Sequence, residues 1–269
     1  DEWTHLNHGP DGNPVSNDRH IVDPYGLRWI GSKTMGWGSF SIRSAGNRVF
    51  LFWDTLLQWV DPKNNAIKIE ARDAYSGVLL WERYYPFPEK ERTRPIAVGD
   101  RIYMLSGKYV IGVDATDGRV LATYKGCETP YDAVVSGGVV VCRDELEVCG
   151  HDAKTGRVLW RFKTSEHPDV LAAYGKRRDG HFQPGWRRQM LVAANGRVFF
   201  TDQRSDDGKQ WNPRIVGLDL DTGEVTWQAS GQSIGRLPHP CVYADGVLMI
   251  TNERGYAGVP VERKGEAWL

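Results

Sequence analysis

The chain has 269 residues, of which 41% are apolar and 25% are charged, and its 34 basic residues balance its 34 acidic ones. This composition is ordinary for a soluble globular protein, and the balanced charge gives no electrostatic reason to expect nucleic acid or an anionic membrane as a partner. No apolar run approaches the ~18 residues that a membrane-spanning helix needs, so we expect no membrane span.

Residues 1–34 are interpreted as a lead-in segment and an N-terminal docking strand, and the part around His5 and Asp11 lacks the periodicity of a strand. His5, His8 and Asp11 could bind a metal ion. However, two histidines three residues apart suit a helix better than a stretch that contains Gly and Pro, so surface histidines are preferred. Because the chain begins at Asp1 rather than at a Met, we expect a processed or excised segment.

Five short stretches each combine an apolar strand, a tight turn and a second apolar strand. They read IRSAGNRVFLFW from residue 42, IAVGDRIYMLS from 96, AVVSGGVVVCR from 133, LVAANGRVFFTD from 191 and CVYADGVLMITN from 241. Their turns contain Asn, Asp or Gly, which tolerate positive φ, so each stretch predicts a β-hairpin.

A second motif follows four of these hairpins, and it consists of an Asp, a Gly four residues later and usually a Trp four residues beyond the Gly. The copies are Asp73, Gly77 and Trp81; Asp114 and Gly118; Asp152, Gly156 and Trp160; and Asp219, Gly223 and Trp227. The Asp side chain can accept hydrogen bonds from backbone N–H groups ahead of it, and the Gly supplies a left-handed residue with which the chain reverses. The motif therefore predicts a structural turn rather than four catalytic carboxylates.

One hairpin and one motif together predict four antiparallel strands in a repeat of about 40 residues. A single sheet of this kind must stack on the next to bury both faces, and a Trp ring is suited to fill the gap between them. We therefore predict an all-β fold, a β-propeller of four-stranded antiparallel blades, of which about four to five are present. The predicted blades are 35–86, 94–126, 131–164, 188–230 and a partial blade 239–269, with a loop insertion at 165–187.

Two loops are candidates for binding. The insertion contains basic and aromatic side chains that could bind an anionic glycan or a partner protein, or could form a solvated loop packed by its own aromatics. The candidate residues are Lys176, Arg177, Arg178, His181, Phe182, Trp186, Arg187 and Arg188. Residues 202–214 gather acidic and amide oxygens but lack the spacing of a calcium loop, so a solvated hairpin loop is preferred.

Four cysteines in a chain of this length do not make a disulfide scaffold. Cys142 and Cys149 could face each other across a short hairpin. Two buried free thiols are an equally good interpretation, and both alternatives stay open.

The pattern Asp-x-x-Thr-Gly-x-x-x-Trp at this period resembles the tryptophan-docking repeat of pyrroloquinoline-quinone-type (PQQ-like) propellers, over nearly the whole chain. The lead-in segment, with N-x-x-S-x-D before L-x-W, resembles bacterial, planctomycete-type members of this group. The resemblance implies a periplasmic or extracellular location and a ring of seven or eight blades, of which this chain would be a part. Ala122 stands where the second motif would have Trp, so we expect that blade junction to be packed differently.

Enzymes of the PQQ-like group oxidise alcohols or sugars with a quinone and a calcium ion, and they often carry two adjacent cysteines bridged as a disulfide. This sequence has no adjacent Cys pair, and no compact Glu, Asn and Asp set matches the calcium ligands. Other relatives, such as outer-membrane assembly scaffolds of the BamB type, bind no quinone. We therefore predict no quinone, calcium or other metal, and we assign no catalytic residue.

The leading functional interpretation is a non-catalytic, extracytoplasmic propeller that presents loops to a protein or carbohydrate partner. One alternative is a PQQ-dependent alcohol or sugar dehydrogenase, or a fragment of one. Another is a propeller domain fused to a downstream enzyme domain. The repeats specify the fold far more closely than the function, because unrelated functions share this fold.

Overall fold

The computed structural model describes the chain in twelve pieces. They are residues 3–5, 8–15, 40–54, 66–86, 95–128, 130–144, 146–164, 191–204, 212–231, 234, 239–252 and 255–262. Over these pieces the chain forms antiparallel β-strands and turns, with no helix and hence no helix able to cross a membrane. It divides into two compact units, Asp1–Gly9 with Pro14–Thr123 and Pro10–Asn13 with Tyr124–Leu269, which are described separately.

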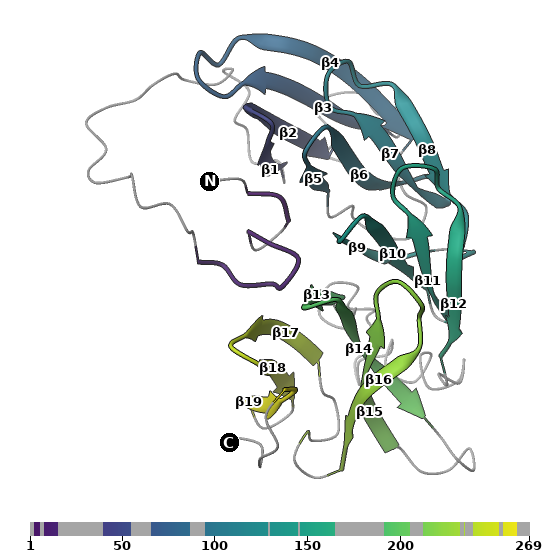
Figure 1. The fold of residues 1–269 in the computed structure, drawn as a ribbon. Helices are drawn as coiled ribbons and strands as arrows, with labels where there is room; N and C mark the ends of the chain where they lie inside the picture. Colours follow the sequence, from purple (N-terminus) through teal and green to yellow (C-terminus); the bar gives the residue numbers. More distant parts are fainter. Residues whose placement is uncertain are drawn as a thin grey trace, which may run out of the picture. The chain divides into compact units, whose positions relative to one another are not determined.

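The first unit contains two four-stranded sheets, each with its strands side by side in chain order (Figure 1). The first sheet consists of β1 (Phe40–Ala45), β2 (Arg48–Asp54), β3 (Ala66–Asp73) and β4 (Leu79–Pro86). The second consists of β5 (Ile96–Val98), β6 (Arg101–Ser106), β7 (Tyr109–Asp114) and β8 (Val120–Tyr124), whose last residue belongs to the second unit. The hairpin turns use left-handed residues, for example Asn47 with φ of 59° and Gly99 with φ of 58°, as the turn sequences predict.

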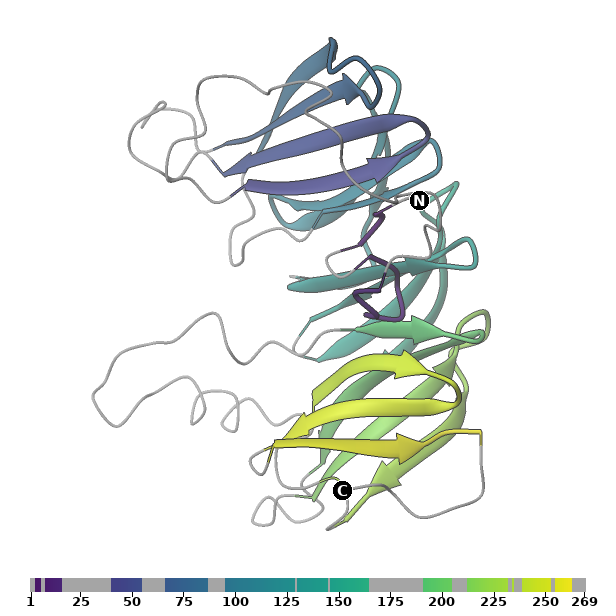
Figure 2. The ribbon, with the colours of Figure 1, turned by 90° about the vertical axis from the view of Figure 1, so that its left-hand side faces the viewer.

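The second unit contains two four-stranded sheets and one three-stranded sheet (Figure 2). The four-stranded sheets are β9 (Asp132–Ser136), β10 (Val139–Arg143), β11 (Glu147–Asp152) and β12 (Val158–Lys163), and then β13 (Val192–Ala194), β14 (Arg197–Arg204), β15 (Asn212–Asp219) and β16 (Val225–Ser230). The last sheet is β17 (His239–Ala244), β18 (Val247–Asn252) and β19 (Gly255–Pro260).

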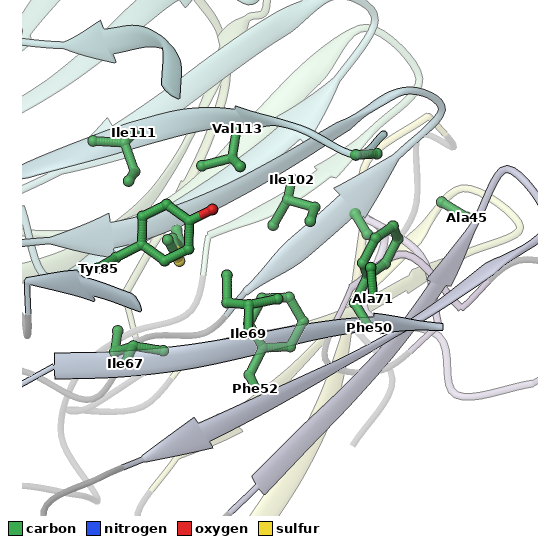
Figure 3. Close-up of a cluster of buried hydrophobic side chains, with 13 residues drawn as sticks. Ala45, Phe50, Phe52, Ile67, Ile69, Ala71, Tyr85, Ile102, Ile111 and Val113 are labelled. Atoms are coloured by element: carbon green, nitrogen blue, oxygen red, sulfur yellow. The ribbon is translucent and has the colours of Figure 1, made fainter. Parts of the chain in front are cut away.

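Stacked sheets form the core of each unit because alternate residues of a strand point to opposite faces. In the first unit, Phe50, Ile67 and Ile69 of one sheet share a buried cluster with Ile102 and Val113 of the other (Figure 3). Face-to-face packing of four-stranded sheets is the packing of neighbouring propeller blades.

In the second unit the sheet β13–β16 is apolar on both faces. Phe200 and Leu218 pack on the sheet β9–β12, and Phe199 and Ile215 pack on the sheet β17–β19. A sheet that buries both faces needs a neighbour on each side, as a blade inside a propeller does. These observations confirm the predicted all-β propeller fold.

Candidate binding surface

The repeated Asp residues fold the turns between the third and fourth strands of the sheets. Asp73 Oδ1 accepts hydrogen bonds from the Ser76 N–H at 2.7 Å and the Ser76 Oγ–H at 2.8 Å. Asp219 Oδ1 accepts the same two bonds from Thr222, at 2.9 and 3.0 Å. The backbone hydrogen bond from Ser76 lowers the pKa of Asp73, and the one from Thr222 lowers the pKa of Asp219. Each carboxylate is thus engaged by its own turn.

In the two middle copies the Asp also accepts hydrogen bonds from its own turn, from different donors. Asp152 Oδ1 accepts bonds from the Thr155 hydroxyl at 2.5 Å and the Thr155 N–H at 2.7 Å, and the hydroxyl bond lowers the pKa of Asp152. Asp114 Oδ1 accepts the Thr116 N–H at 2.7 Å. The four glycines are left-handed, with φ of 72° at Gly77, 76° at Gly118, 78° at Gly156 and 73° at Gly223.

In the first unit, aromatic side chains of β4 form hydrogen bonds with the turn that follows β7. Trp81 Nε1 donates to the Ala115 carbonyl at 3.0 Å, and the Tyr85 hydroxyl donates to the Gly118 carbonyl. A Cβ placed on Gly118 would lie 3.0 Å from Trp81 Cζ3, so the indole rests directly on that glycine. The ring therefore joins the two sheets by contact and by a hydrogen bond.

Trp160 makes the same arrangement in the second unit. Its Nε1 donates to the Leu220 carbonyl at 2.8 Å, and a Cβ on Gly223 would lie 2.6 Å from its Cδ2. The side chain is only 7% exposed and belongs to the cluster between the two four-stranded sheets. Ala115 and Leu220 each follow a motif Asp, so both rings reach the same carbonyl of the repeat.

Where the motif has Ala122 in place of Trp, Tyr124 donates the hydrogen bond to the equivalent carbonyl. Its hydroxyl donates to the carbonyl of Ala153, which follows Asp152, at 2.5 Å. The phenol ring is fully buried and stands edge-on to His151, with ring centroids 5.7 Å apart. Sequence reasoning missed Tyr124, although an aromatic residue two positions after Ala122 was a signal for it.

Trp227, the last repeated Trp, lies in the cluster that β13–β16 forms with β17–β19. Its ring stands edge-on to Phe199, with centroids 5.8 Å apart. All three repeated Trp residues thus lie among core side chains of their own units.

The described part of the lead-in segment pairs with the first strands of sheets. In the first unit, the Trp3 carbonyl accepts the Ser44 N–H at 3.0 Å, and the Thr4 carbonyl accepts the Ala97 N–H at 2.8 Å. Both donors lie two residues before their hairpin turn. The segment therefore satisfies one backbone group at the same position of two sheets.

The second unit receives the next part of the segment in the same manner. The Pro10 carbonyl accepts the Ala193 N–H at 2.8 Å, and the Asp11 carbonyl accepts the Tyr243 N–H at 2.9 Å. These donors again lie two residues before a hairpin turn. The described part of the lead-in is thus a structural element of both units.

The candidate metal ligands of the lead-in have other partners. His5 Nδ1 lies 2.8 Å from Thr4 Oγ1, and the His8 ring stands edge-on to Trp3 at 5.2 Å. Asp11 accepts a hydrogen bond from a backbone N–H two residues ahead. Within the part of the chain that the structure describes, no three His, Cys, Asp or Glu side chains could hold a metal ion together. The absence of a cofactor stays a prediction.

The loop with candidate calcium ligands begins at a buried ion pair. Asp202 Oδ2 accepts bonds from Arg214 Nε at 2.8 Å and Nη2 at 2.7 Å, and the Asp202 side chain is fully buried. The Arg214 guanidinium therefore engages one carboxylate oxygen of the first acidic residue of this loop. Residues 205–211 lie outside the described residues, and so do all eight candidate binding residues of the insertion, from Lys176 to Arg188.

The outer strand β4 carries the largest exposed apolar stretch of the first sheet. Leu79, Leu80 and Tyr84 are 45%, 48% and 58% exposed, and the preceding turn exposes Tyr75 and Val78. Among the described strands β4 pairs only with β3, so one edge of this eight-residue strand faces away from its sheet (Figure 1). We call these five residues the β4 edge patch.

Other outer strands repeat this feature on a smaller scale. Val120 and Leu121 on β8, Leu159 on β12 and Val225 on β16 are 37–51% exposed. All lie between the motif Gly and the Trp position, where the sequence reads GVLLW, GRVLA, GRVLW and GEVTW. Sequence reasoning missed this surface, because the exposure of an apolar residue beside a core Trp depends on which chain segments cover it.

The stacked sheets, their repeated turns and the exposed outer strands define a protein of the PQQ-like β-propeller class. A family model described as outer membrane protein assembly factor BamB matches residues 64–233 and 126–265, which together span most of the chain. The chain belongs to this family. None of the curated proteins compared with the chain matches it.

Solved structures share the fold at low identity. A europium-containing methanol dehydrogenase aligns with a TM-score of 0.53 at 13% identity, over 84% of this chain and 49% of its own. The quinohemoprotein alcohol dehydrogenase from Comamonas testosteroni gives 0.50 at 15% identity, over 76% and 41%. BamB from Moraxella catarrhalis gives 0.49 at 15% identity, over 85% and 63%. The chain thus spans less than two thirds of each of these structures.

Proposed function

We propose that this chain is a non-catalytic, extracytoplasmic propeller that binds a protein partner, and that the partner docks an extended segment along the outer edge of β4. The observation that carries the proposal is the β4 edge patch. A long edge strand with unpaired backbone groups and exposed apolar side chains is a template for another strand. Soluble proteins usually shorten or cover such edges unless the edge is used.

The chemistry of the patch fits strand addition. Backbone hydrogen bonds to the edge would supply affinity, while pockets between alternate side chains such as Leu80 and Tyr84 would supply specificity. Glu82 lies between these two residues, and its carboxylate accepts the Tyr84 hydroxyl at 3.1 Å and lies 3.5 Å from Lys68 Nζ. The charged Glu82 in the middle of the edge strand would disfavour self-association of two identical strands.

Family membership supports a protein partner and a location outside the cytoplasm, because the family is named for a factor in outer membrane protein assembly. The repeated Trp residues then serve as blade-docking side chains and leave the edges free for binding. A carbohydrate partner stays a second prediction, which is based on the aromatic side chains of the insertion.

We also propose that the chain binds no pyrroloquinoline quinone or calcium. Two dehydrogenases share its fold, but at 13% and 15% identity they support the fold alone. Calorimetry with the quinone and calcium should show no specific binding, and the chain should show no dye-linked alcohol oxidation. Stoichiometric submicromolar quinone binding would support the dehydrogenase alternative. A propeller fused to a downstream enzyme domain is compatible with the same docking edge.

The docking proposal can be tested with peptides selected against the full chain from a displayed random library. We expect the selected peptides to be extended and apolar at alternate positions, and to bind at least about tenfold more weakly to Leu80→Glu, the loss expected for an anchor contact. Val225→Glu is the matched control, because Val225 is also 48% exposed and lies on the outer strand β16. Equal binding to the parent and to Leu80→Glu would rule out the β4 edge as the site.

A further inference from the structure

Three buried thiols lie close together in the second unit. Cys142 is on β10 and Cys149 on β11, while Cys127 lies in the segment between β8 and β9. All three are free thiols with at most 1% of their surface exposed. The third thiol, Cys127, was not expected from the sequence, because it is 15 residues from Cys142 and outside the hairpin.

Cys142 and Cys149 are directly opposite each other in the β10–β11 register, as the sequence suggested. The strand pairing nevertheless disfavours a bond between them. Backbone hydrogen bonds join Asp144 to Glu147 and Gly138 to Ala153. Hydrogen-bonded and non-hydrogen-bonded pairs alternate along an antiparallel ladder. Positions 142 and 149 lie an even number of residues from both of these bonds and are therefore a hydrogen-bonded pair, in which the Cα atoms are about 5.5 Å apart.

Residues in hydrogen-bonded pairs hold their Cβ atoms toward the far end of a range of about 4.5–5.5 Å. A disulfide requires about 3.5–4.5 Å between Cβ atoms. The facing cysteines of this hairpin are therefore held too far apart for an unstrained disulfide.

Cys127 approaches Cys149 from outside the hairpin. A Cβ on the neighbouring Gly126 would lie 2.7 Å from Cys149 Cβ, so this backbone rests on the Cys149 side chain. Arg161 Nη1 donates to the Gly126 carbonyl at 2.6 Å and lies 3.9 Å from Cys149 Sγ. Cys127 Sγ itself is 3.3 Å from the carbonyl oxygen of Cys142, the residue opposite Cys149.

The surroundings of the Cys127 thiol also affect its acidity. A hydrogen bond with the Cys149 thiol is the main cause that raises the pKa of Cys127, and burial adds to it. The thiol forms are thus favoured in the closed arrangement. Attack by either sulfur on an external oxidant requires the segment around Cys127 to open, or takes place before the segment has packed.

We propose that Cys127 and Cys149 are a redox pair that a disulfide oxidant converts into an intramolecular disulfide, tying the segment between β8 and β9 to strand β11. In the first step the Cys127 sulfur displaces one thiol from the oxidant and forms a mixed disulfide. In the second step the Cys149 sulfur displaces the other thiol. Each protein thiol loses its proton and each leaving thiol gains one, so the protein is oxidised by two electrons and the oxidant disulfide is reduced to two thiols.

The bond would hold the segment that carries Tyr124 and Gly126 against the sheet β9–β12. It would close a loop across β9 and β10 and limit the unfolded chain, which should raise the melting temperature by about 5–10 °C. Oxidation would thus fix the junction at which Tyr124, rather than Trp, contacts the motif turn. This inference does not depend on the proposed protein partner.

The test is to refold the full chain in a buffer of oxidised and reduced glutathione, block free thiols with N-ethylmaleimide and digest with trypsin and a glutamate-specific protease. Cleavage after Lys125, Glu128, Arg143, Glu147 and Lys154 separates the three cysteines into peptides 126–128, 129–143 and 148–154. We expect peptides 126–128 and 148–154 to be joined and to separate on reduction. The same link should persist in Cys142→Ser and be absent in Cys127→Ser.

A link between 129–143 and 148–154, a link to the peptide that holds Cys241, or three alkylated thiols in the refolded chain would overturn the proposal. The readout on the parent protein is decisive even if a serine variant fails to fold. The melting temperature of the oxidised and reduced parent then shows whether the bond stabilises the second unit, and Cys142→Ser is the matched control for loss of a buried thiol.

Discussion

In the second unit, Trp160 and Tyr124 each donate a hydrogen bond to the carbonyl that follows a motif Asp. At one junction, Trp160 lies flat on Gly223 and its indole N–H reaches the carbonyl after Asp219. At the other, Tyr124 reaches the carbonyl after Asp152 with its hydroxyl. At both junctions a buried side-chain donor reaches the equivalent carbonyl, so the Trp position is only one place from which such a donor comes.

The largest expected effect is on the Trp junction. Trp160→Ala removes a buried ring and leaves a cavity, so we expect the free energy of unfolding to fall by about 3–5 kcal/mol. Ala122→Gly should cost about 1 kcal/mol or less, mainly through backbone entropy, because no ring is lost. Denaturant unfolding of both variants beside the parent measures the difference. An unchanged midpoint for Trp160→Ala, with binding lost instead, would assign the Trp to a binding site.

All four motif glycines are left-handed, and the Trp160 ring packs on Gly223 as the Trp81 ring packs on Gly118. Gly223→Ala should cost about 2–4 kcal/mol, from left-handed strain and from the clash of a Cβ with Trp160. Gly156→Ala should cost about 1–2 kcal/mol, for the strain. In a double-mutant cycle with Trp160→Ala, the clash disappears and the two costs should not add. Additive costs would show that the ring does not rest on Gly223.

The Tyr junction is probed by removing one oxygen. Tyr124→Phe keeps the buried ring and deprives the Ala153 carbonyl of its donor, at an expected cost of about 1–2 kcal/mol. The control is Tyr84→Phe, because the Tyr84 side chain is 58% exposed and its hydroxyl bond should contribute little to stability. Equal stability of Tyr124→Phe and the parent would mean that this hydrogen bond makes no net contribution to the free energy of unfolding.

The smallest effect is a pH dependence that only the Tyr junction should have. His151, against which Tyr124 packs, is fully buried, and burial lowers its pKa. The unfolded chain therefore takes up the proton first as the pH falls below about 6.5, and stability should decrease by at most about 1.4 kcal/mol per pH unit down to the folded pKa. His151→Gln should remove this part of the slope between pH 7 and 5. A slope that is the same in both proteins would show that His151 does not contribute.

Much of the fold was predictable, because its signals are local. Asn47 and Gly99 allow hairpin turns by their own backbone preferences, and Asp73 closes its turn on Ser76 three residues away. The different packing expected at Ala122 follows from the missing ring, and the structure shows Tyr124 at that junction. The exposed β4 edge patch was not predicted, because exposure of Leu80 depends on whether another chain segment covers it.

The sequence by itself determined the repeat, the strand order within each sheet and the residues of the turns, since these depend on contacts between near neighbours in the chain. Only the tertiary structure decided which distant groups meet. The backbone of Gly126, next to Cys127, lies against Cys149, and the carbonyl of Thr4 accepts the N–H of Ala97. Such contacts carry no periodic signal, because they are fixed by how whole sheets stack and not by the conformational preferences of the residues that make them.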